Sequence, residues 1–231
     1  MIRRPSPNFD ARAAAPDMVV LHYTDMADVE AAITLLTTPE SRVSAHYLIT
    51  AEGTLVEMVA EDKRAWHAGV SYWEGARDIN ARAIGIELDS PGHRPGAPVF
   101  PEVQLAALFR LMAGIRTRWT IPRRGVVAHS DIAPTRKIDP GERFPWSRLA
   151  DEGHALFVPP ETSTTGDPAC LWQTLSAAGY DPDADEKARA ALVRAFHRRH
   201  RPDAVAASAD ATTAALAADF LKAVEADRKA G

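Results

Sequence analysis

The segment GVVAHSDIAPTRKIDPG, residues 125–141, combines the two signals on which the fold prediction rests. Its beginning is mostly apolar and predicts a buried strand over residues 125–130. Residues 129–141 contain two prolines and a glycine. Because proline fixes φ and removes a backbone donor, we expect an irregular but stiffened loop there. His129, Lys137 and Asp139 lie in this loop, so reactive side chains are expected where a strand gives way to accessible backbone.

Outward from this segment, short apolar runs alternate with helical patterns over the first 155 residues. The apolar runs predict buried strands over residues 18–24, 44–50, 54–59 and 83–89, the middle two forming a hairpin that turns at Gly53. A short helix is predicted over residues 28–38, with Asp28 as N-cap, and apolar side chains at helical spacing predict a second helix over residues 102–119. Strands interleaved with helices indicate an α/β domain with a mixed central sheet flanked by helices.

The C-terminal part of the chain differs in composition. Residues 158–168 are rich in Pro, Ser, Thr and Gly and are expected to form a linker. Helical patterns follow over residues 169–178, 185–200 and 211–226, with apolar side chains that can form a joint core. The predicted organisation is a domain over residues 1–157, the linker, and a small all-α domain of three helices over residues 169–231.

Composition excludes several classes of protein. The chain has 231 residues, 46% of them hydrophobic and 25% charged, which is a normal globular mixture. A net charge of −4 argues against a nucleic-acid binder, and no apolar run is long enough to predict a transmembrane segment. The single cysteine, Cys170, excludes an intramolecular disulfide and is expected to be a small core residue. The N-terminal residues lack an apolar signal-peptide region, so we expect a cytoplasmic location, or a periplasmic one if the N-terminus is trimmed.

Polar side chains lie near the ends of three expected strands, at His22, Glu87 and His129. Together with Asp139, the two histidines have the composition of a catalytic zinc site, which keeps a fourth position open. Glu87 would then transfer protons, and Lys137 would stabilise an oxyanion. These residues also have structural interpretations. His22 could be a hydrogen-bonded core histidine, His129 or Asp139 could form a turn, and Lys137 could be a solvated loop charge. Glu87 is the strongest candidate from the residues alone, because a carboxylate is costly to bury without a partner.

The segments LHYT, SAHYLI, AWHAG, IGIEL and AHSDIAPTRKIDPG occur in the order seen in zinc-dependent N-acetylmuramoyl-L-alanine amidases. Over residues 16–152 the sequence resembles the AmpD/AmiD branch of that family, which is related to peptidoglycan recognition proteins. The resemblance implies a Zn²⁺ site formed by His22, His129 and Asp139, with Glu87 as the proton shuttle and Lys137 steadying the oxyanion. It also implies a substrate groove lined by Trp66, His67 and Ala68, with Asn80 in the same region. His46 is a further substrate-binding candidate.

Some candidate residues keep a second interpretation. His46 has a structural alternative, and both Trp66 and Trp73 could be core aromatics. Some phage relatives carry a tyrosine directly before the histidine of the SAHYLI segment, where this chain has Ala45, so the resemblance leaves proton transfer to Glu87.

The C-terminal segments LWQTLSAAGYDPD and ALVRAFHRRHRP resemble the three-helix peptidoglycan-binding module that follows several such amidases. The usual glycine and threonine before its second helix are replaced by Asp185, Glu186 and Lys187, so affinity for cell wall is left open. The basic run HRRHR, residues 197–201, is expected to be a solvated helix end, which the helix dipole favours.

The resemblance predicts a zinc hydrolase that cleaves the amide bond between N-acetylmuramic acid, or its 1,6-anhydro form, and L-alanine of the stem peptide. Its partners would be anhydro-muropeptides or peptidoglycan, in recycling or turnover. Two alternatives remain: a recognition protein that binds muropeptides without cleaving them, and a zinc peptidase that cuts within the stem peptide. Retention of all three candidate ligands with Glu87 and Lys137 favours an enzyme.

Overall fold

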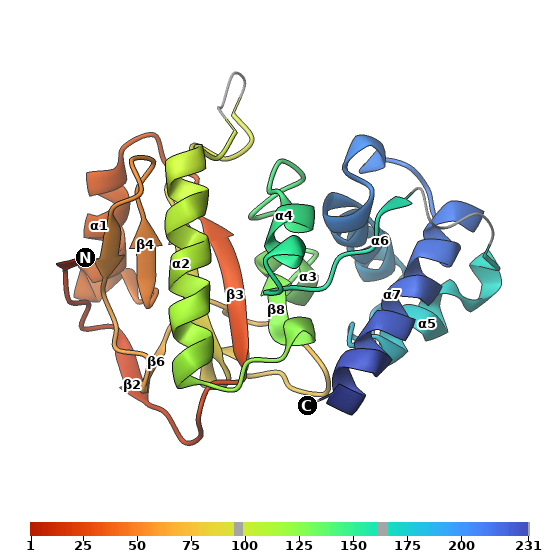
Figure 1. The fold of residues 1–231 in the computed structure, drawn as a ribbon, viewed down its shortest axis with the longest axis horizontal. Coiled ribbons are helices and arrows are strands. Elements are labelled where there is room, and N and C mark those ends of the chain that lie inside the picture. Colours follow the sequence, from red (N-terminus) through yellow and green to blue (C-terminus); the bar gives the residue numbers. More distant parts are fainter. Residues whose placement is uncertain (95–98, 161–165, 231) are drawn as a thin grey trace.

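The computed structural model describes residues 1–94, 99–160 and 166–230. Its centre is a mixed six-stranded sheet with the strand order β1-β5-β4-β7-β3-β8 (Figure 1). The strands are β1 (Ile2–Arg3), β3 (Met18–Tyr23), β4 (Tyr47–Ile49), β5 (Leu55–Glu57), β7 (Ala83–Leu88) and β8 (Val126–Ala128). A separate antiparallel pair consists of β2 (Phe9–Ala11) and β6 (Lys63–Ala65). The predicted α/β domain with a mixed sheet is confirmed.

Strands β7, β3 and β8 are parallel neighbours, and β4 runs parallel to β7. Their carboxyl ends therefore meet at one edge of the sheet, where His22 and Glu87 lie opposite each other in register. The predicted hairpin is also present, because β4 and β5 pair antiparallel around Gly53. Gly53 has φ +80°, and a Cβ there would approach the Val103 carbonyl oxygen to 2.7 Å, so the turn requires glycine.

One face of the sheet is covered by helix α2 (Glu102–Arg118), which crosses in front of it in Figure 1. Alternate β3 residues, Val19 and Leu21, pack in one cluster with Leu108 and Met112 of this helix. Helix α1 (Val29–Thr37) packs on β4 and begins as predicted at Asp28, whose side chain accepts a hydrogen bond from the Glu30 backbone N–H. Both helices were therefore predicted from the sequence, and for α2 the helical spacing also identified the buried face.

The opposite face of the sheet packs against the C-terminal helices. These are α5 (Leu171–Ala177), α6 (Glu186–His200) and α7 (Ala211–Ala230), which lie beside the β8 edge in Figure 1. Met18 and Val20 of β3 belong to the same buried cluster as Phe196 and Phe220 of these helices. The helices therefore share a hydrophobic core with the sheet. The domain boundaries given above stay a prediction, and residues 161–165 of the expected linker lie outside the described residues.

Three expectations are corrected by the structure. The strand predicted over residues 125–130 ends at Ala128, and His129 begins a short helix, α3 (His129–Ile132), inside the segment expected to be irregular. The basic run is not solvated, because Arg199 and His200 are 2% and 0% exposed. Cys170 is exposed and is not a core residue. In each case tertiary packing decides an environment that local sequence does not encode.

A further α-helix of the first part is α4 (Trp146–Asp151), whose Trp146 and Leu149 are buried. None of the helices in the described ranges combines the length and the hydropathy that a membrane span requires.

Candidate metal centre and active site

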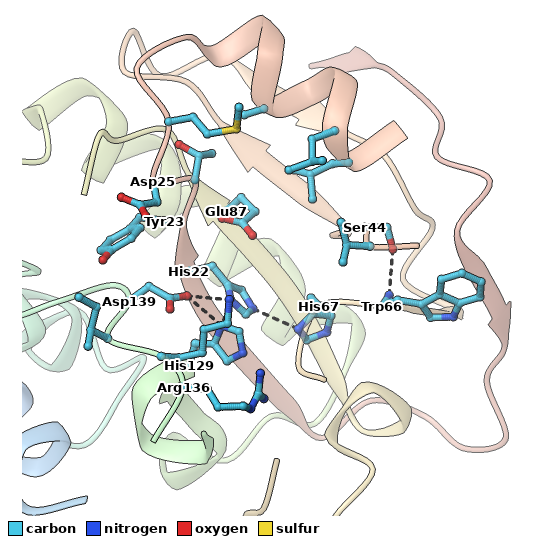
Figure 2. Close-up of a pocket in the computed structure, with 18 residues that line it drawn as sticks. His22, Tyr23, Asp25, Ser44, Trp66, His67, Glu87, His129, Arg136 and Asp139 are labelled. Carbon is cyan, nitrogen blue, oxygen red and sulfur yellow. Dashed lines mark hydrogen bonds and ion pairs between the residues drawn. The ribbon is translucent and has the colours of Figure 1, made fainter. Parts of the chain in front are cut away.

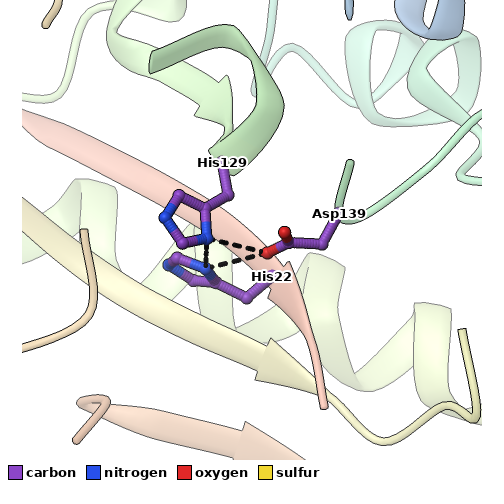
Figure 3. Close-up of side chains that lie close together, drawn as sticks. All are labelled: His22, His129 and Asp139. Atoms are coloured by element: carbon purple, nitrogen blue, oxygen red, sulfur yellow. Dashed lines mark hydrogen bonds and ion pairs between the residues drawn. The ribbon is translucent and has the colours of Figure 1, made fainter. Parts of the chain in front are cut away.

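His22, His129 and Asp139 converge on one point although His22 is far from the other two in the chain. His22 is 107 positions from His129 and 117 from Asp139. The Nδ1 atoms of the two histidines are 2.9 Å apart, and Asp139 Oδ2 lies 3.1 Å from His22 Nδ1 and 3.0 Å from His129 Nδ1 (Figure 3). Figure 3 shows the three side chains reaching this point from β3, from the start of α3 and from the following loop.

This arrangement fits a zinc ion. Ligands at the usual bond length of about 2.0–2.1 Å on a tetrahedron are separated by about 3.3 Å, close to the distances found. Ligating histidines normally donate their second ring N–H to another group, which leaves the ligating nitrogen unprotonated. His129 Nε2 lies 3.2 Å from the Ala68 carbonyl oxygen, and His22 Nε2 lies 3.1 Å from His67 Nδ1. Both histidines therefore have a partner on the side away from the convergence point.

His67 supports His22 and is itself held from below by the sheet. In Figure 2, His22 lies between Asp139 and His67. The His67 ring lies directly over Gly85 of β7, where a Cβ would come within 2.5 Å of His67 Cγ. Glycine at position 85 therefore creates the space that lets His67 reach His22. His67 was expected in the substrate groove, but its contact with a candidate ligand was not predicted.

The electrostatics of His22 and Asp139 are those expected of metal ligands. Burial, followed by the proximity of His129, lowers the pKa of His22 to about 4. Burial alone would raise the pKa of Asp139, but His129 and His22 outweigh it and hold this pKa well below its usual value. At neutral pH the His22 imidazole is therefore neutral and the Asp139 carboxylate is charged, which are the forms that bind metals.

Glu87 stands beside this site on the neighbouring strand. Its register partner on β3 is His22, so both side chains project from the same face of the sheet (Figure 2). Glu87 Oε2 is buried and has no hydrogen-bond partner among the described residues. Burial, and then the charge of Asp139, raises the pKa of Glu87 to about 8. A buried carboxyl with a free oxygen and a pKa near neutrality has the properties of a general acid–base group.

Two adjoining cavities open on the site. The first, of about 510 Å³, contains His22, His129, Asp139 and Glu87 in its wall, together with the apolar side chains of Met26, Leu35, Leu36, Val43 and Ile138. The second, of about 680 Å³, has a more cationic wall that includes Arg42, Arg64 and Arg136. Lys137, Trp66 and His67 line both. The candidate metal site therefore lies at the junction of an apolar and a basic cavity.

The other candidate groove residues take different places. Trp66 donates from Nε1 to Asp10 Oδ2 at 2.7 Å and from its backbone N–H to Ser44 Oγ. Asn80 Oδ1 accepts from the backbone N–H groups of His67 and Ala68, so it holds the segment that lines the second cavity.

His46 is 0% exposed and lies below His67, with its Nδ1 accepting from the Gly85 N–H. Neither cavity includes His46 in its wall, so its position agrees with the structural interpretation. Trp73 is likewise 0% exposed and packs against Tyr180 in the core.

Arg136 is a residue of the site that was not predicted from the sequence. This residue lines both cavities and donates to the carbonyl oxygens of Ala68 and Val70. It thereby ties the loop of Lys137 and Asp139 to the segment that supports His129. Its position directly before Lys137 was the available signal, but nothing in the local pattern distinguishes it from a solvated arginine.

The sequence profile of the N-acetylmuramoyl-L-alanine amidase family, Amidase_2, matches residues 12–142. The chain belongs to this family. Among its relatives, N-acetylmuramoyl-L-alanine amidase AmiD of Escherichia coli is 36% identical over 238 residues, covering 92% of this chain and 85% of AmiD. The 1,6-anhydro-N-acetylmuramyl-L-alanine amidase AmpD of Escherichia coli is 33% identical, covering 64% of this chain and 88% of AmpD.

Solved structures agree with the family assignment. AmiD of Escherichia coli, in complex with the substrate anhydro-N-acetylmuramic acid-L-Ala-D-γ-Glu-L-Lys, matches with a TM-score of 0.81 and 35% identity over 93% of this chain and 92% of that one. AmpDH3 of Pseudomonas aeruginosa matches with a TM-score of 0.83 and 31% identity over 91% of this chain and 92% of that one. The amidase therefore has the fold and family predicted from its sequence, including its C-terminal helices.

Proposed function

We propose that this amidase hydrolyses the amide bond between the lactyl group of N-acetylmuramic acid and L-alanine of the stem peptide. We propose the 1,6-anhydro sugar as its main substrate form, which places the enzyme in peptidoglycan recycling. AmiD, which is similar to this chain over nearly its whole length, is described with an anhydro-muropeptide substrate bound. AmpD relatives are named for the same 1,6-anhydro substrate class.

The observation that carries this proposal is the convergence of His22 Nδ1, His129 Nδ1 and Asp139 Oδ2 on the wall of a cavity that also holds Glu87 and Lys137. We propose these three atoms as ligands of Zn²⁺. Zinc held by three protein ligands lowers the pKa of a water molecule to about 7 and polarises a carbonyl oxygen.

The chain's own residues divide the remaining work. Glu87, with its unpaired Oε2, takes a proton from the attacking water and delivers it to the departing amine of L-alanine. Lys137 lines both cavities, where its ammonium group stabilises the negative charge that develops on the carbonyl oxygen. Trp66, His67, Ala68 and Asn80 line the second cavity, and the first two also line the cavity of the metal site, so we propose all four as substrate contacts.

Digestion products separate this proposal from its alternatives. Zinc-loaded and chelator-stripped protein would be incubated with an anhydro-muropeptide and with intact sacculi, and the products analysed by mass spectrometry. We expect a free peptide that begins at L-alanine, no activity after chelation, and recovery on addition of zinc. Cleavage within the peptide would indicate a peptidase. An unchanged substrate in the presence of bound zinc would indicate a recognition protein, and faster cleavage of sacculi would contradict the recycling substrate.

Two finer expectations stay predictions. Binding of cell wall by the C-terminal helices would be tested by sedimentation of the inactive protein with purified sacculi. The cytoplasmic location would be tested by fractionation of cells that make the native protein.

A further inference from the structure

A buried arginine from the C-terminal helices reaches the segment that presents His129. Arg199, on α6, is 2% exposed, and its guanidinium lies 4.0 Å from the centroid of the Trp146 ring. An arginine is almost never fully buried unless its donors are paired. Arg199 therefore has a specific structural task, which its contacts identify.

The donors of Arg199 bind acceptors on both sides of the junction between β8 and α3, an arrangement that we call the bracket. On one side, Nη1 and Nη2 both donate to the Val126 carbonyl oxygen at 3.3 Å. On the other side, Nη1 donates to Asp131 Oδ2 at 3.1 Å. Val126 and Asp131 lie on either side of His129, the first residue of α3. The planar fork of arginine suits such a bracket, because it holds several acceptors in fixed geometry.

The far edge of the guanidinium is fixed as well. Arg199 Nε and Nη2 donate to the Leu156 carbonyl oxygen at 3.2 and 2.6 Å. The arginine is therefore anchored to a third segment, and it cannot shift without breaking contacts to all three.

Asp131 completes the bracket. Its Oδ2 also accepts from the Ala128 backbone N–H at 2.9 Å, which fixes the turn where the strand becomes a helix. Its Oδ1 accepts from the hydroxyl of Tyr180, a second residue of the C-terminal part, at 3.2 Å. Both Asp131 and Tyr180 are buried, so these hydrogen bonds are made in a medium where an unpaired group is costly.

We propose that Arg199, with Tyr180, is a positioning residue for the metal ligand His129. The C-terminal helices are then part of the scaffold of the metal site, in addition to any affinity they have for cell wall. This inference rests on the proposed zinc site. Outer residues that orient ligands typically change metal affinity by about 10–100-fold when they are removed, which sets the size of the expected effect.

The test measures the zinc dissociation constant of the full chain by competition with a chromogenic chelator, alongside its melting temperature without metal. Arg199→Met removes the bracket, Arg199→Lys keeps a charge without the fork, and Tyr180→Phe removes one hydroxyl while keeping the ring. Val224→Ala is the matched control. Val224 is a fully buried residue of α7 in the same core, and its apolar side chain has no group that could hydrogen-bond to Asp131.

We expect zinc affinity to fall about 10–100-fold in Arg199→Met and by less in Tyr180→Phe and Arg199→Lys. We expect Val224→Ala to lower the melting temperature while its zinc affinity stays within about twofold of wild type, because cavity formation in this core leaves the bracket intact. A folded Arg199→Met with wild-type zinc affinity would overturn the inference.

If Arg199→Met does not fold, Arg199→Lys and Tyr180→Phe decide, and wild-type affinity in both would overturn it equally. A loss of affinity in Val224→Ala as large as in Arg199→Lys would also overturn it, because general destabilisation would then explain the effect. Failure of the wild-type chain to bind zinc at all would instead refute the proposed function on which the inference rests.

Discussion

A single added methyl group at Gly85 should weaken the metal site without touching a ligand. In Gly85→Ala the new Cβ would lie 2.5 Å from His67 Cγ, 2.6 Å from Cδ2 and 2.8 Å from Nδ1. Because carbon atoms in contact are separated by about 3.5–4.0 Å, the ring must move by about 1 Å. The His67–His22 contact is 3.1 Å long, and a displacement of this size takes it beyond hydrogen-bonding distance.

Two quantities follow from this displacement. Forcing a side chain out of a packed site costs about 1–3 kcal/mol of stability, which we expect to see in chemical unfolding of the metal-free protein. Loss of the partner that orients a ligating histidine lowers metal affinity by about tenfold or more, which equals about 1.4 kcal/mol. Chelator competition measures the second quantity separately from the first.

The double variant Gly85→Ala with His67→Ala is the control. Once the ring is gone, the methyl group has space, so the second substitution should cost little, and the two single costs should be strongly non-additive. Gly85→Ala with wild-type stability and wild-type zinc affinity would refute the reasoning. Fully additive costs would refute it as well, because the effect would then not pass through His67.

Further predictions concern the site and the pH dependence of stability. Glu87→Gln should keep full zinc content by elemental analysis and lose about 10²–10⁴-fold in turnover, and a wild-type rate would remove Glu87 from the proposed chemistry. His129→Ala should lose bound zinc, and full occupancy would exclude His129 as a ligand. Burial alone would raise the pKa of Glu61, but hydrogen bonds from Arg118, Trp119 and Tyr47 outweigh it and lower the pKa. The stability from this carboxylate is therefore present above its unfolded-state pKa and lost as the pH falls through the folded-state value. The free energy of unfolding, measured with denaturant between pH 6 and 3, should thus fall less steeply with decreasing pH in Glu61→Gln than in wild type. An identical pH dependence in the two proteins would contradict this assignment.

Periodicity and apolar runs identified the elements that carry the fold. β3, β7 and α2 were predictable because each has a pattern of apolar residues that its own geometry requires. The junction between strand and helix at His129 was not predictable, because the continuous apolar run predicts a strand up to Ser130. The short helix that replaces its end depends on the Asp131 side chain, which binds the Ala128 N–H and is held by Arg199.

The burial of Arg199 could not be predicted from the local sequence either. Its acceptors lie 43, 68 and 73 positions away in the chain, so no local pattern in HRRHR can reveal them. Among the candidate ligands, His22 lies 107 and 117 positions from His129 and Asp139, and spacing alone gave only a weak signal for the set. The family motif supplied those residues. The role of Gly85 beneath His67 is evident only in the folded structure, because the two residues are 18 positions apart and lie on different segments.

The large separation of His22 from the other two convergent residues also bears on how the enzyme matures. An unfolded chain offers no preformed chelate, so free energy gained from zinc is gained almost entirely by the folded protein, about 2.7 kcal/mol at a hundredfold excess over the dissociation constant. During synthesis His22 leaves the ribosome long before His129 and Asp139 have been added to the chain. Loading of the metal is therefore expected after translation has passed Asp139, and cells short of zinc should accumulate a less protease-resistant enzyme.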